Sequence, residues 1–204
     1  MKSKFFIGCG IIAGIFILIG LIVVSVGIGS YNKMVKMDEN VKSRWSQVEN
    51  VYQRRLDLIP NLVETVKGYA AHERETFQAV TEARARAGGM VNLGGQALNN
   101  PETFQKFQEA QNSLSGALQR LMVVVERYPE LKANQNFLAL QDQLEGTENR
   151  IAIERQRFNE AAQEFNTSIK QFPRVILANL FGFKERPYFR AQPGANEAPK
   201  VRFK

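Results

Sequence analysis

The sequence predicts an all-α protein, with an N-terminal transmembrane helix followed by an antiparallel, up-down four-helix bundle. Three observations lead to this prediction. Residues 5–29 contain no charged side chain, apolar residues recur at alternating spacings of three and four through most of residues 31–172, and strand-like alternation is scarce. Proline and glycine interrupt the second region at only a few places, which divide it into four helical segments.

The uncharged segment, Phe5–Gly29, follows a short basic terminus (residues 1–4) and predicts a membrane anchor. As a helix its 25 residues span ~37 Å, enough to cross a hydrocarbon core of ~30 Å. A cleaved secretory signal has an apolar stretch of only ~7–15 residues before a small-residue cleavage site. Here the apolar run continues through residues 21–24 and meets no such site. We therefore expect an uncleaved, single-pass anchor.

Two signals disagree about the side of the membrane on which the remainder lies. Lys2 and Lys4 precede the segment, whereas Lys33 and Lys36 are followed by further cations, and the positive-inside rule then places the large domain in the cytoplasm. A basic terminus followed by a long apolar run is instead typical of a signal-anchor with an exported domain. Both orientations stay open at this point.

The distribution of charge argues against a nucleic-acid partner. Residues 31–173 contain 18 Lys and Arg against 18 Asp and Glu, whereas residues 174–204 contain seven cations against two carboxylates. A nucleic-acid binder would present a basic stripe on its folded surface. A neutral body with a basic C-terminus favours membrane lipid as a partner, because a surface Lys or Arg near anionic lipid contributes ~1 kcal/mol.

The first two predicted helices lie on either side of Pro60. The first, about 31–57, carries an apolar stripe at Tyr31, Met34, Val41, Trp45, Val48 and Tyr52. Proline disfavours helix at the residue before it and is tolerated in the first turn of a helix, so we expect a break at Asp57–Asn61 and a second helix over about 60–87. The glycines of residues 88–95 predict a flexible loop.

The third and fourth helices carry the strongest periodicity. Asn100 is expected to cap the third, with Pro101 at its first position. The fourth, about 135–171, has apolar residues every seven positions, at Phe137, Leu144, Ile151, Phe158, Phe165 and Phe172. A strict seven-residue repeat implies left-handed, nearly aligned packing, as in four-helix bundles. An open two-stranded coiled coil is the alternative, but stripes on all four segments favour the bundle.

Four charged residues occupy positions in these stripes where apolar residues are expected: Arg55, Glu73, Glu148 and Arg155. An unpaired buried charge costs several kcal/mol, so we expect them to pair with one another inside the bundle. Arg55 with Glu148 is the first choice, and Arg55 with Glu73 the second. One interpretation is a structural polar layer that fixes helix register, and the other is a ligand or proton site.

The sequence offers few groups for catalysis or metal binding. His72 is the one histidine, and no second histidine completes a zinc-protease motif around His72-Glu73. Cys9 lies inside the apolar segment, and the glycines of residues 88–95 lack a phosphate-binding Gly-Lys-Ser or Gly-Lys-Thr ending. We therefore expect no enzyme activity, no catalytic residues, no cofactor and no metal.

Two features suggest contacts with other molecules. Gly10 and Gly14 have the spacing that lets two membrane helices approach closely, which favours a homo-oligomer. Residues 173–190 form an amphipathic aromatic and basic segment, which we expect at the membrane-proximal end of the bundle. Its candidate membrane-interface residues are Phe181, Phe183, Lys184, Arg186, Tyr188 and Arg190. The alternative is that its apolar residues cover the open end of the bundle, and residues 191–204 are expected to be disordered.

Several motifs closely resemble the bacterial LemA family. They include Trp45-Ser46-Gln47-Val48-Glu49-Asn50, the stretch from Arg54 to Val63, Glu126-Arg127-Tyr128-Pro129-Glu130-Leu131 and Phe172-Pro173, so the likeness covers about residues 30–190. The resemblance implies a helical bundle with an N-terminal membrane segment. It brings no catalytic residues, because the family has no established enzymatic activity. Some relatives resemble lipoproteins with a cysteine where this chain has Ser30, which favours the bundle on the periplasmic side of the bacterial inner membrane.

Two functions are compatible with this picture. The first is a non-enzymatic envelope protein that self-assembles as a scaffold at the membrane. The second is a regulatory adaptor for a membrane protease or another envelope enzyme, because relatives are often encoded beside such proteins. The second function requires a membrane protein partner, whereas the first requires another copy of the chain.

Overall fold

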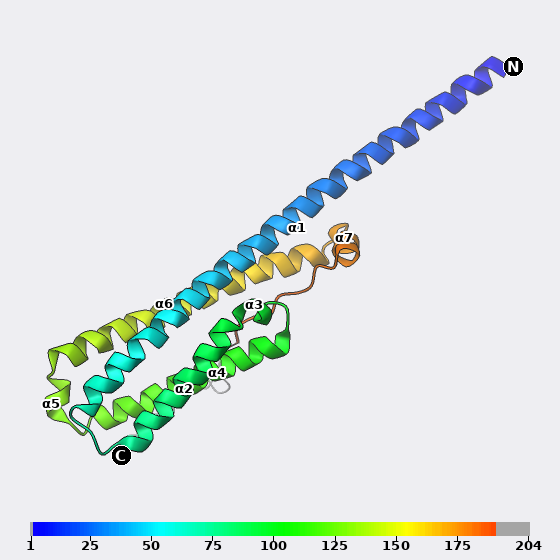
Figure 1. Ribbon diagram of the computed structural model, residues 1–204. Helices are drawn as coiled ribbons and strands as arrows, with labels where there is room; N and C mark the ends of the chain where they lie inside the picture. Colours follow the sequence, from blue (N-terminus) through cyan, green and yellow to red (C-terminus); the bar gives the residue numbers. More distant parts are fainter. Residues whose placement is uncertain (1, 191–204) are drawn as a thin grey trace, which may run out of the picture. The chain divides into compact units, whose positions relative to one another are not determined.

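The computed structural model describes the backbone of residues 2–190 and the side chains of residues 14–190, and it contains helices and no strand within that range (Figure 1). The all-α prediction is thus confirmed, as is the long apolar N-terminal helix. The helices are α1 (Lys2–Lys67), α2 (Arg74–Asn92), α3 (Gly94–Ala97), α4 (Pro101–Val125), α5 (Pro129–Lys132), α6 (Gln135–Lys170) and α7 (Arg174–Phe181).

The chain divides into two compact units. The first unit consists of Met1–Ser43 and Ala161–Arg186, and the second of Arg44–Glu160 and Pro187–Lys204. Helices α1 and α6 each contribute to both units, because the divisions fall inside them.

The N-terminal part of α1 presents its apolar side chains to the outside. From Ile15 to Ile28 every large aliphatic or aromatic residue is at least half exposed. Among the described residues, this is the one helix long and apolar enough to cross a membrane. Water would strongly disfavour such an extended apolar surface, which suits a lipid environment.

The predicted break at Asp57–Asn61 is wrong, because α1 continues through Pro60 to Lys67. Proline lacks the N–H that would bond the carbonyl of Leu56, four residues earlier. The Nε–H of Arg84 donates to that carbonyl at 2.8 Å and replaces the missing bond. The chain turns instead at residues 68–73, so the second helix begins at Arg74.

The predicted glycine loop is also largely helical. Helix α2 includes Gly88 and Gly89 and ends at Asn92, and α3 begins at Gly94. Buried Ala87 and half-buried Val91 hold this end of α2 against the apolar core. Gly94 packs so closely on α1 that an added Cβ would lie 1.7 Å from Glu49 Oε1. This glycine therefore permits close packing.

The starts of α4 and α6 depend on asparagine caps. The Asn100 side chain accepts hydrogen bonds from the backbone N–H groups of Glu102 and Thr103 at 2.9 and 3.3 Å, and Pro101 occupies the first turn, as predicted. Asn134 Oδ1 likewise accepts from the N–H of Phe137 at 3.0 Å, just before α6. Each cap satisfies backbone donors that the helix itself leaves unpaired.

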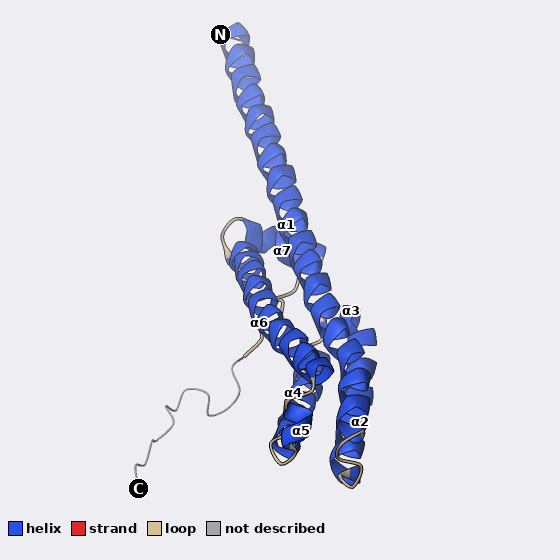
Figure 2. Ribbon diagram, turned by 90° about the vertical axis from the view of Figure 1, so that its left-hand side faces the viewer, coloured by secondary structure: helices blue, strands red, loops and turns tan. Residues whose placement is uncertain are grey.

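The second unit is built around one apolar core. Helices α2 and α4 pack against each other (Figures 1 and 2). The cluster also takes side chains from the part of α1 between Leu56 and Val66 and from Phe137 and Leu144 of α6. Burial of these apolar side chains is the main favourable contribution to folding.

The seven-residue series of α6 is buried from Phe137 to Phe165 and then stops. Phe172, which the periodicity placed in the same seam, is 81% exposed. Helix α6 ends at Lys170, so residue 172 no longer follows the helical repeat. In the first unit the chain then forms α7, which ends at Gly182 in a left-handed conformation (φ 75°) that glycine adopts without steric strain.

Candidate functional site

Beyond α7, residues 183–190 form an irregular segment that we call the C-terminal strap. Within the second unit, Phe189 of the strap is buried in a group of aromatic rings. Its ring centroid lies 4.8 Å from that of Phe104, 5.5 Å from that of Phe158 and 6.0 Å from that of Trp45. The end of the strap is therefore part of the core of that unit.

Asn159 of α6 fixes the backbone of Phe189 from both sides. Its Nδ2 donates to the Phe189 carbonyl at 3.0 Å, and its Oδ1 accepts from the Phe189 N–H at 2.9 Å. The carbonyl of Arg190 accepts from Gln108 Nε2 at 2.8 Å and from Arg155 Nη2 at 3.2 Å. Four hydrogen bonds thus anchor two consecutive strap residues.

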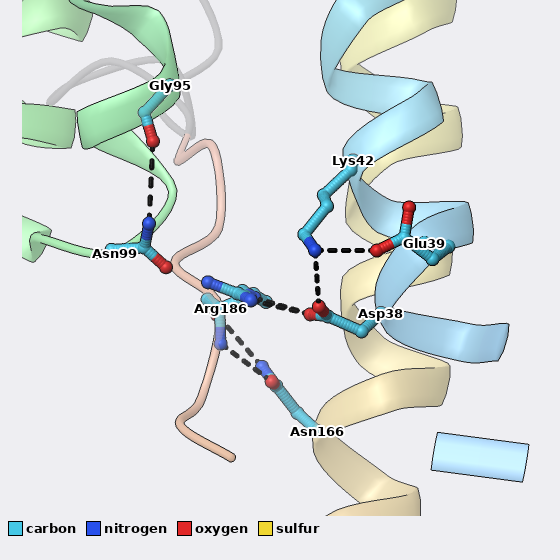
Figure 3. Close-up of polar contacts among 7 residues, drawn as sticks. All are labelled: Asp38, Glu39, Lys42, Gly95, Asn99, Asn166 and Arg186. Carbon is cyan, nitrogen blue, oxygen red and sulfur yellow. Dashed lines mark hydrogen bonds and ion pairs between the residues drawn. The ribbon is translucent and has the colours of Figure 1, made fainter. Parts of the chain in front are cut away.

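Asn166 makes the same reciprocal pair in the first unit. Its Nδ2 donates to the Arg186 carbonyl at 2.9 Å, and its Oδ1 accepts from the Arg186 N–H at 2.8 Å. The Arg186 side chain extends from the strap to Asp38 of α1, where its Nε donates to Oδ1 at 3.1 Å (Figure 3). Both side chains of this ion pair are about 90% buried, with exposed fractions of 10% and 11%.

Lys42 completes this group on the α1 side. Its Nζ lies 3.1 Å from Asp38 Oδ2 and 2.6 Å from Glu39 Oε1 (Figure 3). The hydrogen bond to Glu39 and that to Asp38 raise the pKa of Lys42 above its ordinary value of 10.5. Asp38 therefore has a cationic partner from its own helix and another from the strap.

The sequence interpretation missed Asn159 and Asn166. A signal for them exists, because each directly follows a phenylalanine of the seven-residue series, Phe158 and Phe165. They therefore share one face of α6, beside the apolar seam. Asparagine is polar and does not contribute to an apolar repeat, so the search for apolar stripes did not detect either residue.

The predicted membrane-interface residues have several different environments. Arg186 is held by Asp38, and the Arg190 backbone is held by Gln108 and Arg155. Phe183 is half-buried against Phe165, with 6.2 Å between the ring centroids. The others are exposed, namely Phe181, Lys184 and Tyr188. Arg186 and Phe183 are thus used for packing within the first unit.

Arg55 forms the central polar network of the second unit. Its side chain is 2% exposed, and its Nη1 donates to Glu148 Oε1 at 2.9 Å and to Ser115 Oγ at 3.0 Å. Its Nη2 donates to the side-chain Oε1 of Gln111, which is itself buried. The guanidinium also lies over the ring of Tyr52, 5.1 Å from its centroid. Helices α1, α4 and α6 therefore meet at this residue.

The other three charged residues of the predicted layer are arranged differently. Glu148 pairs with Arg55 but its side chain is 41% exposed, so the pair lies at the edge of the core. Arg155 is half-buried, with its guanidinium 4.6 Å from the Phe189 ring centroid. Glu73 precedes α2 and pairs with Arg127 at 3.0 Å. It lies outside the Arg55 network because the chain turns before residue 74 and not at Pro60.

Two titratable groups near the aromatic core have altered pKa values. Burial raises the pKa of Tyr52 above 10.0, and the charges of Arg155 and Arg55 oppose that increase. Burial also raises the pKa of Glu49 above 4.5, although Glu49 Oε1 accepts a hydrogen bond from Trp45 Nε1 at 2.8 Å.

A shallow groove of about 570 Å³ lies between α4 and α6 in the second unit. Its lining is mostly apolar, with Leu118, Met122, Val123 and Leu144 among the residues, and Glu145 and Glu148 add acidic groups. Val123 is largely exposed. Within residues 14–190, no three His, Cys, Asp or Glu side chains form a group that could hold a metal ion. The apolar lining of the α4–α6 groove is suited to packing against another helix.

A sequence model of the LemA family matches residues 44–203, most of the chain. This chain belongs to the LemA family. It is similar to magnetosome protein MamQ of Magnetospirillum gryphiswaldense, with 30% identity over 186 residues that cover 84% of this chain and 68% of the relative. It is 31% identical, with the same coverage, to magnetosome protein MamQ 2 of Paramagnetospirillum magneticum. Protein LemA of Metamycoplasma hominis is 23% identical over 145 residues, which are 71% of this chain and 62% of that protein.

Membership of the LemA family agrees with the resemblance seen in the sequence motifs. The matched region includes the Arg55 network, the α4–α6 groove and the whole strap. The names of the family and of these relatives state no catalytic activity.

Proposed function

We propose that this LemA-family chain is a non-enzymatic, single-pass protein of the bacterial inner membrane that self-assembles as a scaffold. One observation carries the proposal: the exposed apolar segment of α1 continues, without a break in the helix, into the helical body. Such a connection suits a protein that holds partners close to the membrane.

The proposed body is an antiparallel, up-down four-helix bundle. Support comes from the second unit, where α1, α2, α4 and α6 all contribute side chains to one apolar cluster. The connections between these helices are short enough for each to fold back on the preceding one. The strap adds Phe189 to this arrangement, which up-down bundles do not require.

The proposed location of the bundle is the periplasmic side. The support is the basic terminus followed by a long uncleaved apolar helix, and the cationic residues after that helix are the argument against it. A full-length Cys9→Ser, Ile153→Cys variant tests the location. A membrane-impermeant maleimide should label Ile153→Cys in spheroplasts before lysis, because that side chain is exposed and lies outside the groove. Labelling only after lysis would place the bundle in the cytoplasm.

The α4–α6 groove is the proposed surface for self-assembly. Val123 stands exposed beside it, and an apolar surface of this kind is stabilised when a second helix covers it. A photo-crosslinking amino acid at Val123, in intact membranes, should give a homotypic product of about 46 kDa, twice the chain mass of 23.1 kDa. The matched control carries the same amino acid at exposed Glu75, where we expect little product.

The adaptor function is the second candidate, and the same groove supports it, since its acidic residues could receive a basic helix of another protein. In that case the Val123 product would contain one dominant different membrane protein, identified by mass spectrometry. A homotypic product would favour the scaffold, and a heterotypic one the adaptor. No product above the Glu75 control would contradict both uses of the groove.

A further inference from the structure

Helix α7 in the first unit has an apolar face that the protein leaves uncovered. Ile176 and Leu180 lie one helical turn apart on one side and are 59% and 74% exposed. Ala178, on the opposite side, is buried against the protein. Phe172, four residues before Ile176, is also largely exposed. An amphipathic helix with its apolar face directed outward needs an apolar environment there.

The position of α7 indicates what that environment is. The ring of Phe181, at its end, lies 4.7 Å from the ring of Tyr31, and Phe183 lies 5.9 Å from the same ring. Tyr31 follows the exposed apolar segment of α1 after a single residue, Ser30. Helix α7 is thus attached at the point where the proposed membrane span ends. It also runs across α1 and not alongside it (Figure 2), as a helix lying in the membrane plane would.

Cationic groups lie beside α7 in the first unit. A groove of about 370 Å³ is lined by Lys33 of α1 and Arg174 of α7, together with Met37, Glu164 and neutral polar residues. Arg174 Nη1 is held by Ser168 Oγ at 3.0 Å, and Lys33 is exposed. Aromatic residues with Lys or Arg at the end of a membrane span are typical of the headgroup region.

We propose that α7 is an interfacial helix, with Ile176 and Leu180 inserted into the headgroup–acyl boundary of the membrane that α1 spans, and with Lys33 and Arg174 at the anionic headgroups. This inference rests on the proposed anchoring by α1. It differs from the expectation from sequence, because Arg186 and Phe183 are used inside the first unit and Ile176 and Leu180 take the lipid contact. Lipid is a better partner for the α7 face than protein, because this face adjoins the exposed apolar surface of α1 that ends near Ile28.

Spin labels in the full chain test this proposal. Three Cys9→Ser variants carry a nitroxide label at Ile22, Leu180 or Ile153, all exposed positions. They represent the span, α7 and the second unit. Each is reconstituted in vesicles of equal parts phosphatidylglycerol and phosphatidylcholine. The readout is the ratio of accessibility to oxygen, which concentrates in lipid, to accessibility to a water-soluble nickel chelate.

The proposal expects severalfold higher ratios at Ile22 and Leu180 than at Ile153. A ratio at Leu180 equal to that at Ile153, with Ile22 in lipid, would overturn the α7 proposal and leave the anchor intact. A low ratio at Ile22 would overturn the anchor itself. A Leu180 label shielded from both reagents would show that protein covers α7, which also overturns the proposal.

Charge variants test the headgroup contact. In the same vesicles, Lys33→Gln with Arg174→Gln should lower the ratio at Leu180 toward its value in pure phosphatidylcholine, because the attraction to anionic headgroups is lost. The control pair Lys67→Gln with Arg120→Gln removes two exposed cations of the second unit and should leave the ratio unchanged. Equal effects of both pairs would contradict a specific headgroup contact.

Discussion

At the residue scale, single polar side chains with several partners hold this protein together. Arg55 bonds acceptors from two other helices, and Asn159 and Asn166 each bond both backbone groups of a strap residue. Buried polar groups are costly unless they are satisfied, so such residues stabilise one arrangement against alternatives. Substitutions of these residues therefore test the described contacts most directly.

The Arg55–Glu148 pair should show coupling in a double-mutant cycle. Glu148→Gln leaves a buried cation with only neutral acceptors, and we expect a loss of about 1–3 kcal/mol, since partial exposure of Glu148 moderates the cost. Arg55→Met should cost a similar amount, and the double variant less than the sum. Urea denaturation measures all three. Strict additivity, or a Glu148→Gln effect no larger than that of the neighbouring Glu145→Gln, would contradict the pairing.

Glu49 predicts an unusual pH dependence. Because its folded pKa is raised, this carboxyl stabilises the fold below its ordinary pKa of 4.5 and loses that contribution as the pH rises through the folded value. Glu49→Gln keeps an acceptor for Trp45 and should therefore raise the thermal midpoint at pH 7 but not at pH 4. Glu102 is the control, because its pKa is lowered by Lys106. Glu102→Gln should give no increase at pH 7.

At the element scale, long helices persist through residues that usually end them. Pro60 lies inside α1 because Arg84, a residue of α2, bonds the carbonyl that the proline leaves free. The compensating group lies 24 positions away in sequence, and a local proline rule therefore failed here. Where the determinants are local, as at Asn100-Pro101, or periodic, as in the series from Phe137 to Phe165, sequence reasoning placed the element correctly.

The contribution of Arg84 to the stability of the fold should depend on the presence of Pro60. Arg84→Met should cost about 1–2 kcal/mol, because the Leu56 carbonyl loses its partner. In a Pro60→Ala background the backbone N–H of residue 60 can donate a hydrogen bond to the Leu56 carbonyl. Arg84→Met should therefore destabilise that variant much less. Arg86→Met, an exposed neighbour on α2, is the control. Equal costs of Arg84→Met in both backgrounds would show that the arginine does not compensate the proline.

The C-terminal strap was the element that sequence reasoning described least well. It has no helical periodicity, and its one fully packed side chain, Phe189, stands among exposed aromatic and basic residues. The bonds that fix it come from Asn159 and Asn166, which stripe analysis passed over. Phe189 is packed among the aromatic rings of the second unit, whereas Lys184 and Tyr188 are exposed.

Phe189 should be as important as a residue of the main helical core. Phe189→Ala should destabilise the protein by about 3–5 kcal/mol, similar to Phe158→Ala, because both rings are buried in one aromatic cluster. Phe172→Ala removes a ring that is 81% exposed and should cost under about 1 kcal/mol. Chemical denaturation of the three variants gives the comparison. A Phe189→Ala midpoint close to that of Phe172→Ala would mean that the strap is not packed.

At the scale of the whole molecule, we propose a helical body that folds by itself and an apolar helix that holds it at a membrane. The body obtains its stability from apolar burial and from the polar networks above, and residues 31–204 contain no cysteine for a disulfide. The apolar part of α1 contributes no buried side chain between Ile15 and Ile28. Anchoring and folding should therefore be separable.

Carbonate extraction of membranes tests this separation directly. Full-length protein should stay in carbonate-washed membranes, whereas residues 31–204 alone should appear in the soluble fraction and unfold in one cooperative helical transition by circular dichroism. The full-length protein is retained because carbonate removes peripheral proteins but leaves spanning helices in place, and residues 31–204 lack the spanning segment. Release of the full-length protein by carbonate, or a 31–204 fragment that aggregates or melts without cooperativity, would contradict the account.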